Sequence, residues 1–204
     1  MLKTMKPLCL AAALLCAGTG AQAAITVYTS QAAFLSAVST PGYDTFDDLR
    51  VVPYDTTLAR TAGTYGYQAY SPDGLWGAGG TGGDYWLSNE NAYTPIVFQN
   101  FSGGVSAFGG NFFTSNISGQ YVIGNLVLTA ADGSTLDYAL NGTTTSSFLG
   151  FVSDTALTSV TVAGDGGLYW PTANNVVLAV PEPATYGMLL AGIGLLGVAA
   201  RRRR

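Results

Sequence analysis

Short runs of alternating apolar and polar residues fill the chain between residues 24 and 179, and turn-forming residues separate them. Alternation with period two predicts half-buried β-strands, because successive side chains of a strand point to opposite faces of a sheet. The strands we expect are, in chain order, residues 43–46, 96–101, 105–113, 122–130, 135–140, 148–152, 157–162 and 175–179. Many short strands with frequent turns predict an all-β domain, and we expect a jelly-roll-like β-sandwich.

Local signals add one short N-terminal helix and two turns to this pattern. Ser30 is a favourable N-cap for a helix over residues 30–38, whose apolar face would include Phe34. The Asp-Gly pair at residues 132–133 predicts a two-residue hairpin turn, and the Asn-Gly pair at 141–142 predicts the next turn.

Residues 62–91 differ from the rest because they combine many glycines with tyrosine and tryptophan. We interpret them as a long surface excursion between strands, and such loops often carry function. Trp76, Tyr85 and Trp86 are its candidate ligand-binding residues, since flat aromatic rings stack on sugar rings. Buried aromatic residues are also the ordinary core of a sandwich without cysteines, so the packing interpretation stays open.

The N-terminus has the three parts of a secretory signal peptide. Lys3 and Lys6 precede a short apolar run over residues 8–17, and small residues lead to Ala23. We therefore expect a signal peptidase to remove residues 1–23. The apolar run is too short to cross about 30 Å of hydrocarbon, which argues against a permanent anchor here.

The charge of the domain between the two ends is strongly negative. Residues 24–179 contain two basic residues, Arg50 and Arg60, and eleven acidic residues, a net charge of −9. Such a surface repels nucleic acid and can attract cations. A nucleic-acid-binding role is therefore excluded.

The residue types that are absent exclude most catalytic chemistry. The chain has no histidine, its two cysteines (Cys9 and Cys16) lie in the signal peptide, and residues 24–179 contain no lysine. This composition excludes Ser-His-Asp and Cys-His catalysis, Schiff-base chemistry and nearly all zinc sites. A carboxylate pair, as in glycoside hydrolases, remains, but scattered acids carry little information. We expect no enzyme activity.

Calcium is the cofactor that the sequence best allows, because calcium takes six to eight oxygen ligands from Asp, Asn and carbonyl groups. Asp44, Asp47 and Asp48 cluster near an early strand, and Asn175 lies in the last strand. If the first and last strands are neighbours, these four residues form a candidate calcium site. A solvated acidic turn is the alternative.

The C-terminus has three parts in a fixed order: a short motif, an apolar run over residues 184–200 and a basic cluster over residues 201–204. The motif consists of Val180, Pro181, Glu182 and Pro183, and the cluster of Arg201, Arg202, Arg203 and Arg204. The apolar run predicts a single membrane helix, and the arginines would stay in the cytoplasm by the positive-inside rule. An ordinary single-pass anchor is the alternative to a removable signal.

This C-terminal segment resembles the PEP-CTERM sorting signal of diderm bacteria. The resemblance implies processing by an exosortase, a membrane protease-transpeptidase, after an intermediate stage in the inner membrane. Residues 45–48, 108–113, 148–151 and 170–176 are also similar to a recurring ectodomain type of this family, which looks like a jelly roll and resembles carbohydrate-binding modules.

Three hypotheses on function follow. The first is an exported, non-enzymatic protein of the cell surface or the exopolysaccharide matrix. The second is a calcium-dependent carbohydrate-binding module, and the third is a carboxylate-based glycoside hydrolase.

Overall fold

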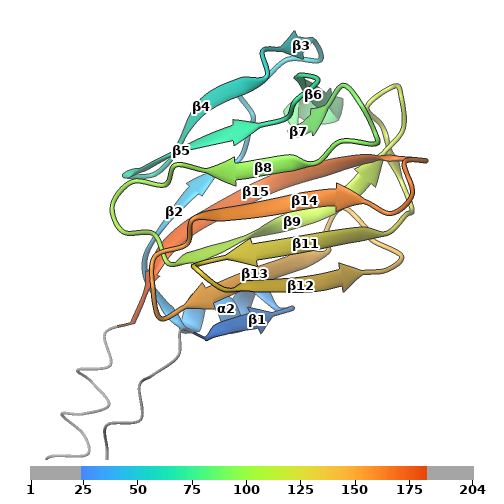
Figure 1. Cartoon of the computed structure of the whole chain (residues 1–204). Helices are drawn as coiled ribbons and strands as arrows, with labels where there is room; N and C mark the ends of the chain where they lie inside the picture. Colours follow the sequence, from blue (N-terminus) through green and yellow to red (C-terminus); the bar gives the residue numbers. More distant parts are fainter. Residues whose placement is uncertain (1–23, 183–204) are drawn as a thin grey trace, which may run out of the picture.

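Two antiparallel sheets, packed face to face, form the part of the chain that the computed structural model describes, residues 24–182 (Figure 1). The nine-stranded sheet contains, in spatial order, β1 (Ile25–Tyr28), β13 (Phe148–Ser153), β9 (Ala107–Ser115), β15 (Trp170–Pro181), β7 (Tyr85–Asn89), β6 (Leu75–Gly79) and β3 (Pro53–Tyr54), with β10 (Tyr121–Val122) beside β9 and β2 (Val38–Asp44) beside β15. The six-stranded sheet contains β12 (Thr135–Leu140), β11 (Leu126–Ala131), β14 (Ser159–Gly164), β8 (Ile96–Gln99), β5 (Tyr65–Tyr70) and β4 (Thr57–Ala62). The all-β sandwich that the sequence predicted is confirmed.

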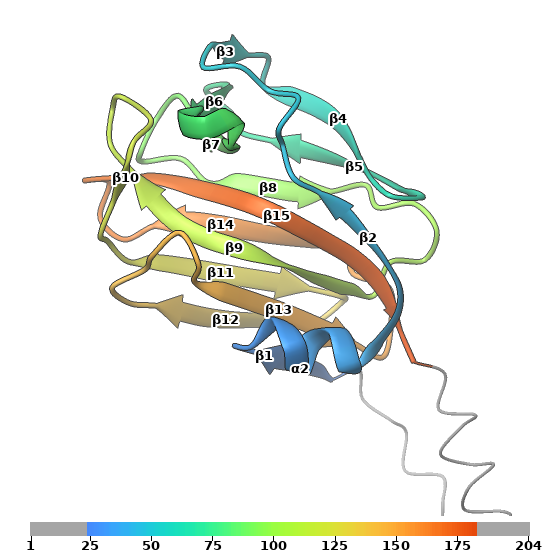
Figure 2. The same cartoon turned by 180° about the vertical axis from the view of Figure 1, so that it is seen from behind.

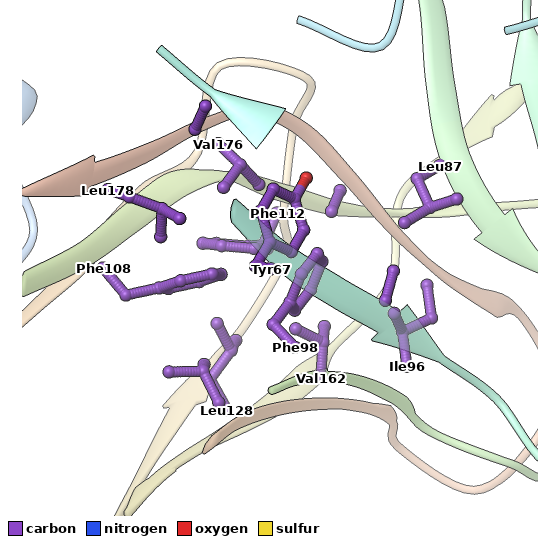
Figure 3. Close-up of a cluster of buried hydrophobic side chains, with 14 of the residues drawn as sticks. Tyr67, Leu87, Ile96, Phe98, Phe108, Phe112, Leu128, Val162, Val176 and Leu178 are labelled. Atoms are coloured by element: carbon purple, nitrogen blue, oxygen red, sulfur yellow. The ribbon is translucent and has the colours of Figure 1, made fainter. Parts of the chain in front are cut away.

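The main hydrophobic core lies between the two sheets (Figure 3). Phe98 and Leu128 of the six-stranded sheet contribute to it, as do Phe108, Phe112 and Leu178 of the nine-stranded sheet, and all five are fully buried. The ring centroids of Phe98 and Phe108 are 5.0 Å apart, which joins the two sheets through direct aromatic contact.

The helix α2 (Gln31–Ser36) packs on the outer face of the nine-stranded sheet, beside β13 (Figure 2). Ser30 is its N-cap, as predicted, and Ser30 Oγ accepts a hydrogen bond from the Ala33 N–H (3.5 Å). Phe34 is fully buried against Gly109 and Gly150, which lie opposite each other on β9 and β13. These glycines make room for the ring, because a Cβ at Gly150 would lie 2.9 Å from Phe34 Cε2.

Residues 62–91 form strands β5, β6 and β7, so the predicted surface excursion is wrong. Along β5, buried residues alternate with half-buried ones, and Tyr65 and Tyr67 belong to the main core. Glycine and tyrosine together concealed a regular period-two pattern. The turn between β6 and β7 is a single short 3-10 helix, Thr81–Gly83.

Two further predictions in the middle of the chain need correction. The strand expected over residues 122–130 is interrupted, because β10 ends at Val122 and β11 begins only at Leu126. The β11–β12 hairpin closes over three residues, 132–134, rather than two, with Gly133 in the left-handed region (φ 109°). β12 has the predicted ends, and the other predicted strands overlap β2, β8, β9, β13, β14 and β15 with shifted ends. The strand predicted over residues 43–46 overlaps β2 only at 43–44, and β15 begins at Trp170 rather than at residue 175.

The ends of β15 lie at opposite ends of the sandwich (Figures 1 and 2). Trp170 lies at the end that carries the loops around β10, whereas Pro181 lies where the described part of the chain both begins and stops. A strand of this length spans about 40 Å at a rise of about 3.3 Å per residue. A site at Trp170 is therefore far from the C-terminal motif.

Candidate ligand-binding site

A cavity of about 280 Å³ opens on the outer face of the nine-stranded sheet, at the end far from residue 182. Its lining residues come from neighbouring strands and from the β9–β10 loop: Pro53, Trp76, Ser88, Asn89, Glu90, Ser115, Asn116, Ile117, Gly119 and Trp170. The pairs Pro53–Trp76, Trp76–Ser88 and Trp170–Ser115 lie directly opposite each other in the sheet. The pairing of β3, β6, β7, β15 and β9 therefore determines which residues line the cavity.

The outward direction of these side chains follows from strand alternation. Leu75 and Leu87 belong to the main core, so the intervening positions Trp76 and Ser88 face away from it. On β15, Ala173 is in the core, and Thr172 therefore faces outward.

Buried hydroxyl groups lie next to one another beneath the cavity. Thr172 Oγ1 donates to Ser115 Oγ (2.9 Å) and lies 3.3 Å from Ser88 Oγ, which in turn donates to the Pro171 carbonyl oxygen (3.0 Å). All three hydroxyl residues are buried. The floor is thus polar and held in place by its own hydrogen bonds, which fixes the position of its remaining lone pairs.

Two indole side chains stand on either side of this floor. Trp76 on β6 and Trp170 on β15 are both half-buried, and β7 lies between their strands. Two inter-strand spacings place β6 and β15 about 10 Å apart, and both indoles line the cavity between them. Ile117, 81% exposed, and Asn116 extend the rim from the β9–β10 loop.

Of the three predicted ligand-binding aromatics, only Trp76 lines the cavity. Trp86 is 9% exposed and packs edge-on against Phe113, with ring centroids 4.9 Å apart. Tyr85 packs against the main core, and the Arg50 guanidinium lies over its ring at 5.3 Å. For Trp86 and Tyr85 the packing interpretation describes the structure better.

The second wall, Trp170, was missed because the expected strand began five residues later, at residue 175. Its place in the cavity depends on the pairing of β15 with β9, which no local pattern reveals. The alternation of Trp170, Thr172 and Asn174 with Pro171 and Ala173 is the signal that would have lengthened the strand.

The predicted calcium ligands Asp44 and Asp48 are bound to arginine. Arg60 Nε and Nη2 donate to the two Asp44 carboxylate oxygens (2.9 and 2.6 Å), while Nη1 and Nη2 donate to Asp48 (both 2.7 Å). Tyr67 donates its phenol proton to Asp44 Oδ2 (2.7 Å). The positive charge near these carboxylates is therefore a guanidinium group.

The pKa values of this cluster reflect the same contacts. The hydrogen bonds from Arg60 hold the pKa of the Asp48 carboxyl below its usual value. Burial raises the pKa of the Tyr67 phenol well above its ordinary value, and the neighbouring Asp44 raises it further. Burial opposes the charge on Arg60, but hydrogen bonds to Asp48 and Asp44 outweigh it and raise the pKa of the guanidinium. The guanidinium, the two carboxylates and the phenol act as one hydrogen-bonded unit whose net charge is −1.

The other two predicted ligands lie beside this cluster without joining it. Asp47 is exposed, and Asn175 donates to Asn111 Oδ1 (3.2 Å), although its neighbour Val176 does pair with Asp44. The expected adjacency of an early strand and the last strand is thus present. Among residues 24–182, no group of three or more His, Cys, Asp or Glu side chains is placed to hold a metal ion. Calcium binding stays a prediction.

The start of the C-terminal motif is part of the sheet. In the β2–β15 ladder, Val180 pairs with Ser39 and Pro181 with Val38. The Glu182 N–H then donates to the Ala37 carbonyl oxygen (3.2 Å).

Comparison with known families decides what this motif is. The family model of the PEP-CTERM protein-sorting motif matches residues 179–204. The chain is a PEP-CTERM protein. No curated protein matches the chain.

The sorting motif marks this PEP-CTERM protein for export and cell-surface sorting, with an exosortase as its processing partner. The predicted signal peptide (1–23), Pro183, the apolar run (184–200) and the arginine cluster (201–204) lie outside the described residues. Within residues 24–182, no helix is long and apolar enough to cross a membrane.

Proposed function

We propose that this PEP-CTERM protein is a non-enzymatic glycan-binding protein of the exopolysaccharide layer, which an exosortase delivers from an inner-membrane intermediate. The observation that carries the proposal is the cavity in which Trp76 and Trp170 flank a floor of buried hydroxyl groups. A pyranose ring has apolar C–H faces and a polar edge. Two aromatic walls and a hydrogen-bonding floor match these two parts.

The rim supplies a further group that suits a sugar hydroxyl. Asn116 Oδ1 accepts hydrogen bonds from the Ser118 and Gln120 N–H groups (2.9 and 3.1 Å), which fixes the orientation of the side chain. Its Nδ2 is then the part of the amide that can donate to a ligand. Polar groups held in fixed positions beside aromatic and apolar side chains are typical of small-molecule sites.

The place of the cavity also suits a surface protein. Its lining residue Trp170 begins β15, and Pro181 ends the same strand at the opposite end of the sandwich (Figure 2), so the start of the sorting motif lies far from the cavity. A domain held by its C-terminal side would present the cavity to the surrounding matrix.

We expect Trp76→Ala and Trp170→Ala each to weaken glycan binding by about tenfold or more, because each removes one stacking wall. Affinity electrophoresis of the processed protein through gels containing neutral polysaccharides such as hydroxyethylcellulose, starch or dextran measures the retardation. Tyr93→Ala is the matched control, since Tyr93 is an 80% exposed aromatic residue outside the cavity.

Equal retardation of Trp76→Ala, Trp170→Ala and the wild type would contradict the proposal. The same gels, run with calcium or with a chelator, test whether glycan binding depends on calcium. Because Asp44 is paired with Arg60, we expect equal retardation under both conditions. Release of reducing sugar during incubation would instead revive the glycoside hydrolase hypothesis.

A further inference from the structure

One charged side chain lines the cavity, and it is a carboxylate. Glu90 directly follows β7, the strand between those of Trp76 and Trp170, and lines the same cavity as both indoles. Its N–H donates to the Gly74 carbonyl oxygen (3.1 Å), which holds its backbone against β6. Among residues 24–182, the salt bridges all involve Arg60, so the exposed Glu90 carboxylate has no cationic partner there.

The two basic side chains of the described residues lie elsewhere. Arg60 is bound to Asp44 and Asp48, and Arg50 lies over Tyr85 and donates to the Leu49 carbonyl oxygen (2.6 Å). Neither arginine lines the cavity. The potential at the cavity is therefore negative, and a uronate or phosphate group would meet repulsion there.

We propose that the cavity prefers glycans that carry a protonated amine, namely hexosamine polymers with free amino groups, over N-acetylated, neutral or anionic ones. This inference rests on the proposed function, since it names the ligand class of the same cavity. A cation near an indole face is attracted by the quadrupole of the ring, and Trp is the best of the aromatic partners. The Glu90 carboxylate adds a charge-assisted hydrogen bond to the same ammonium group.

Chitosan and chitin oligomers of equal length test the inference, because they differ only in acetylation of the amine. Binding is measured by isothermal titration calorimetry at about pH 6, where an amine of this type is largely protonated. We expect wild-type protein to bind the free-amine oligomer about tenfold more tightly. Glu90→Gln should lower this preference, because it removes the carboxylate's share of the attraction and leaves both indoles in place.

Asp137→Asn is the matched control for net charge, since Asp137 is exposed on β12 of the opposite sheet. If Asp137→Asn lowers the preference as much as Glu90→Gln does, the attraction is diffuse and the inference is wrong. If the protein retains neutral glucans but shows no preference for the free amine, the inference on the ligand class is wrong and the proposed glycan-binding function stands. If neither oligomer nor any neutral glucan binds, the proposed function itself fails.

A different observation concerns the sorting motif. Val180 and Pro181 are paired with β2, and Ser39 Oγ lies 3.5 and 3.4 Å from their carbonyl oxygens. Only Glu182 and Pro183 separate this strand from the apolar run that begins at residue 184. We infer that the end of β15 must separate from β2 before the exosortase can process the chain, because a protease binds substrate as an extended segment with free backbone groups.

A disulfide between Ser39→Cys and Val180→Cys would lock the two strands together. Directly opposite strand residues have Cα atoms about 4.5–5.5 Å apart, which a disulfide spans. In the native host, we expect the full-length protein with this cross-link to accumulate with its tail uncleaved, at about tenfold the wild-type level, as measured by intact mass.

The two single-cysteine variants test whether the substitutions themselves impair recognition. Tyr43→Cys with Val177→Cys locks the same strands further into the domain and should leave processing unchanged. If protein cross-linked between residues 39 and 180 loses its tail at the wild-type rate, the inference is wrong.

Discussion

Replacing Arg60 with alanine is expected to lower the free energy of unfolding by about 3–5 kcal/mol, as when one partner is removed from a buried ion pair. The Arg60 and Asp44 side chains are 10% and 4% exposed, so the change leaves the Asp44 charge desolvated and without its partner. The pair also joins the two sheets, because Asp44 ends β2 and Arg60 lies on β4. Equilibrium urea unfolding of the processed protein measures the loss.

Arg50→Ala is the control for this prediction. Arg50 is exposed, and its guanidinium contacts the Asp48 and Leu49 carbonyl oxygens and the ring of Tyr85, so we expect a loss below about 1 kcal/mol. Removing both charges with Asp44→Leu and Arg60→Met should recover part of the stability, because no desolvated charge is then left. If Arg60→Ala costs no more than Arg50→Ala, the cluster does not hold the sheets together.

The same cluster shows why the metal prediction and the structure diverge. Asp44, Asp47 and Asp48 are close in sequence, and local clustering of carboxylates is what a calcium site requires. The partner that binds Asp44 and Asp48 is Arg60, on a strand of the opposite sheet. The pairing of Arg60 with these acids could not be predicted because Arg60 lies on a separate strand, whereas the acids are close together in the sequence.

Features that depend on neighbouring residues were the most predictable. The Ser30 cap fixed the start of α2, and the alternation of β8, β9, β13 and β14 placed those strands with small shifts. The C-terminal motif was equally plain, because its three parts are consecutive. Local signals therefore determined the fold class and the destination of the protein.

The cavity could be predicted only in part, because the pairing of strands far apart in the sequence brings its lining residues together. Trp76 was identified from its residue type, but its opposing wall Trp170 is 94 positions later in the sequence. Glu90 was one of eleven scattered acids until the pairing of β6, β7 and β15 brought it into the same cavity as two indoles. The chemistry of the site is a property of the sheet rather than of any segment.

Replacing Gly150 with alanine is expected to destabilise the fold by about 1–3 kcal/mol, as overpacking of a close-packed site does. The added Cβ would lie within 3 Å of the Phe34 ring, which is fully buried between α2 and the sheet. Either the ring leaves its position or α2 moves away from β13. Equilibrium urea unfolding of the processed protein gives the value.

A double-mutant cycle with Phe34→Ala identifies the cause of that loss. If the collision with the ring is responsible, Gly150→Ala should cost little in a Phe34→Ala background, and the two changes should couple by about 1–3 kcal/mol. Gly66→Ala is the matched control, because the atom nearest to its added Cβ is Ser102 Oγ at 3.3 Å, far from α2 in the fold. If the losses in unfolding free energy from Gly150→Ala and Phe34→Ala are additive, the added Cβ does not act by colliding with the ring. The loss at Gly150 would then come from its backbone conformation. Coupling confined to this pair would show that packing of the Phe34 ring against two glycines holds α2 on the sheet. This contact lies close to the strand end that carries the sorting motif.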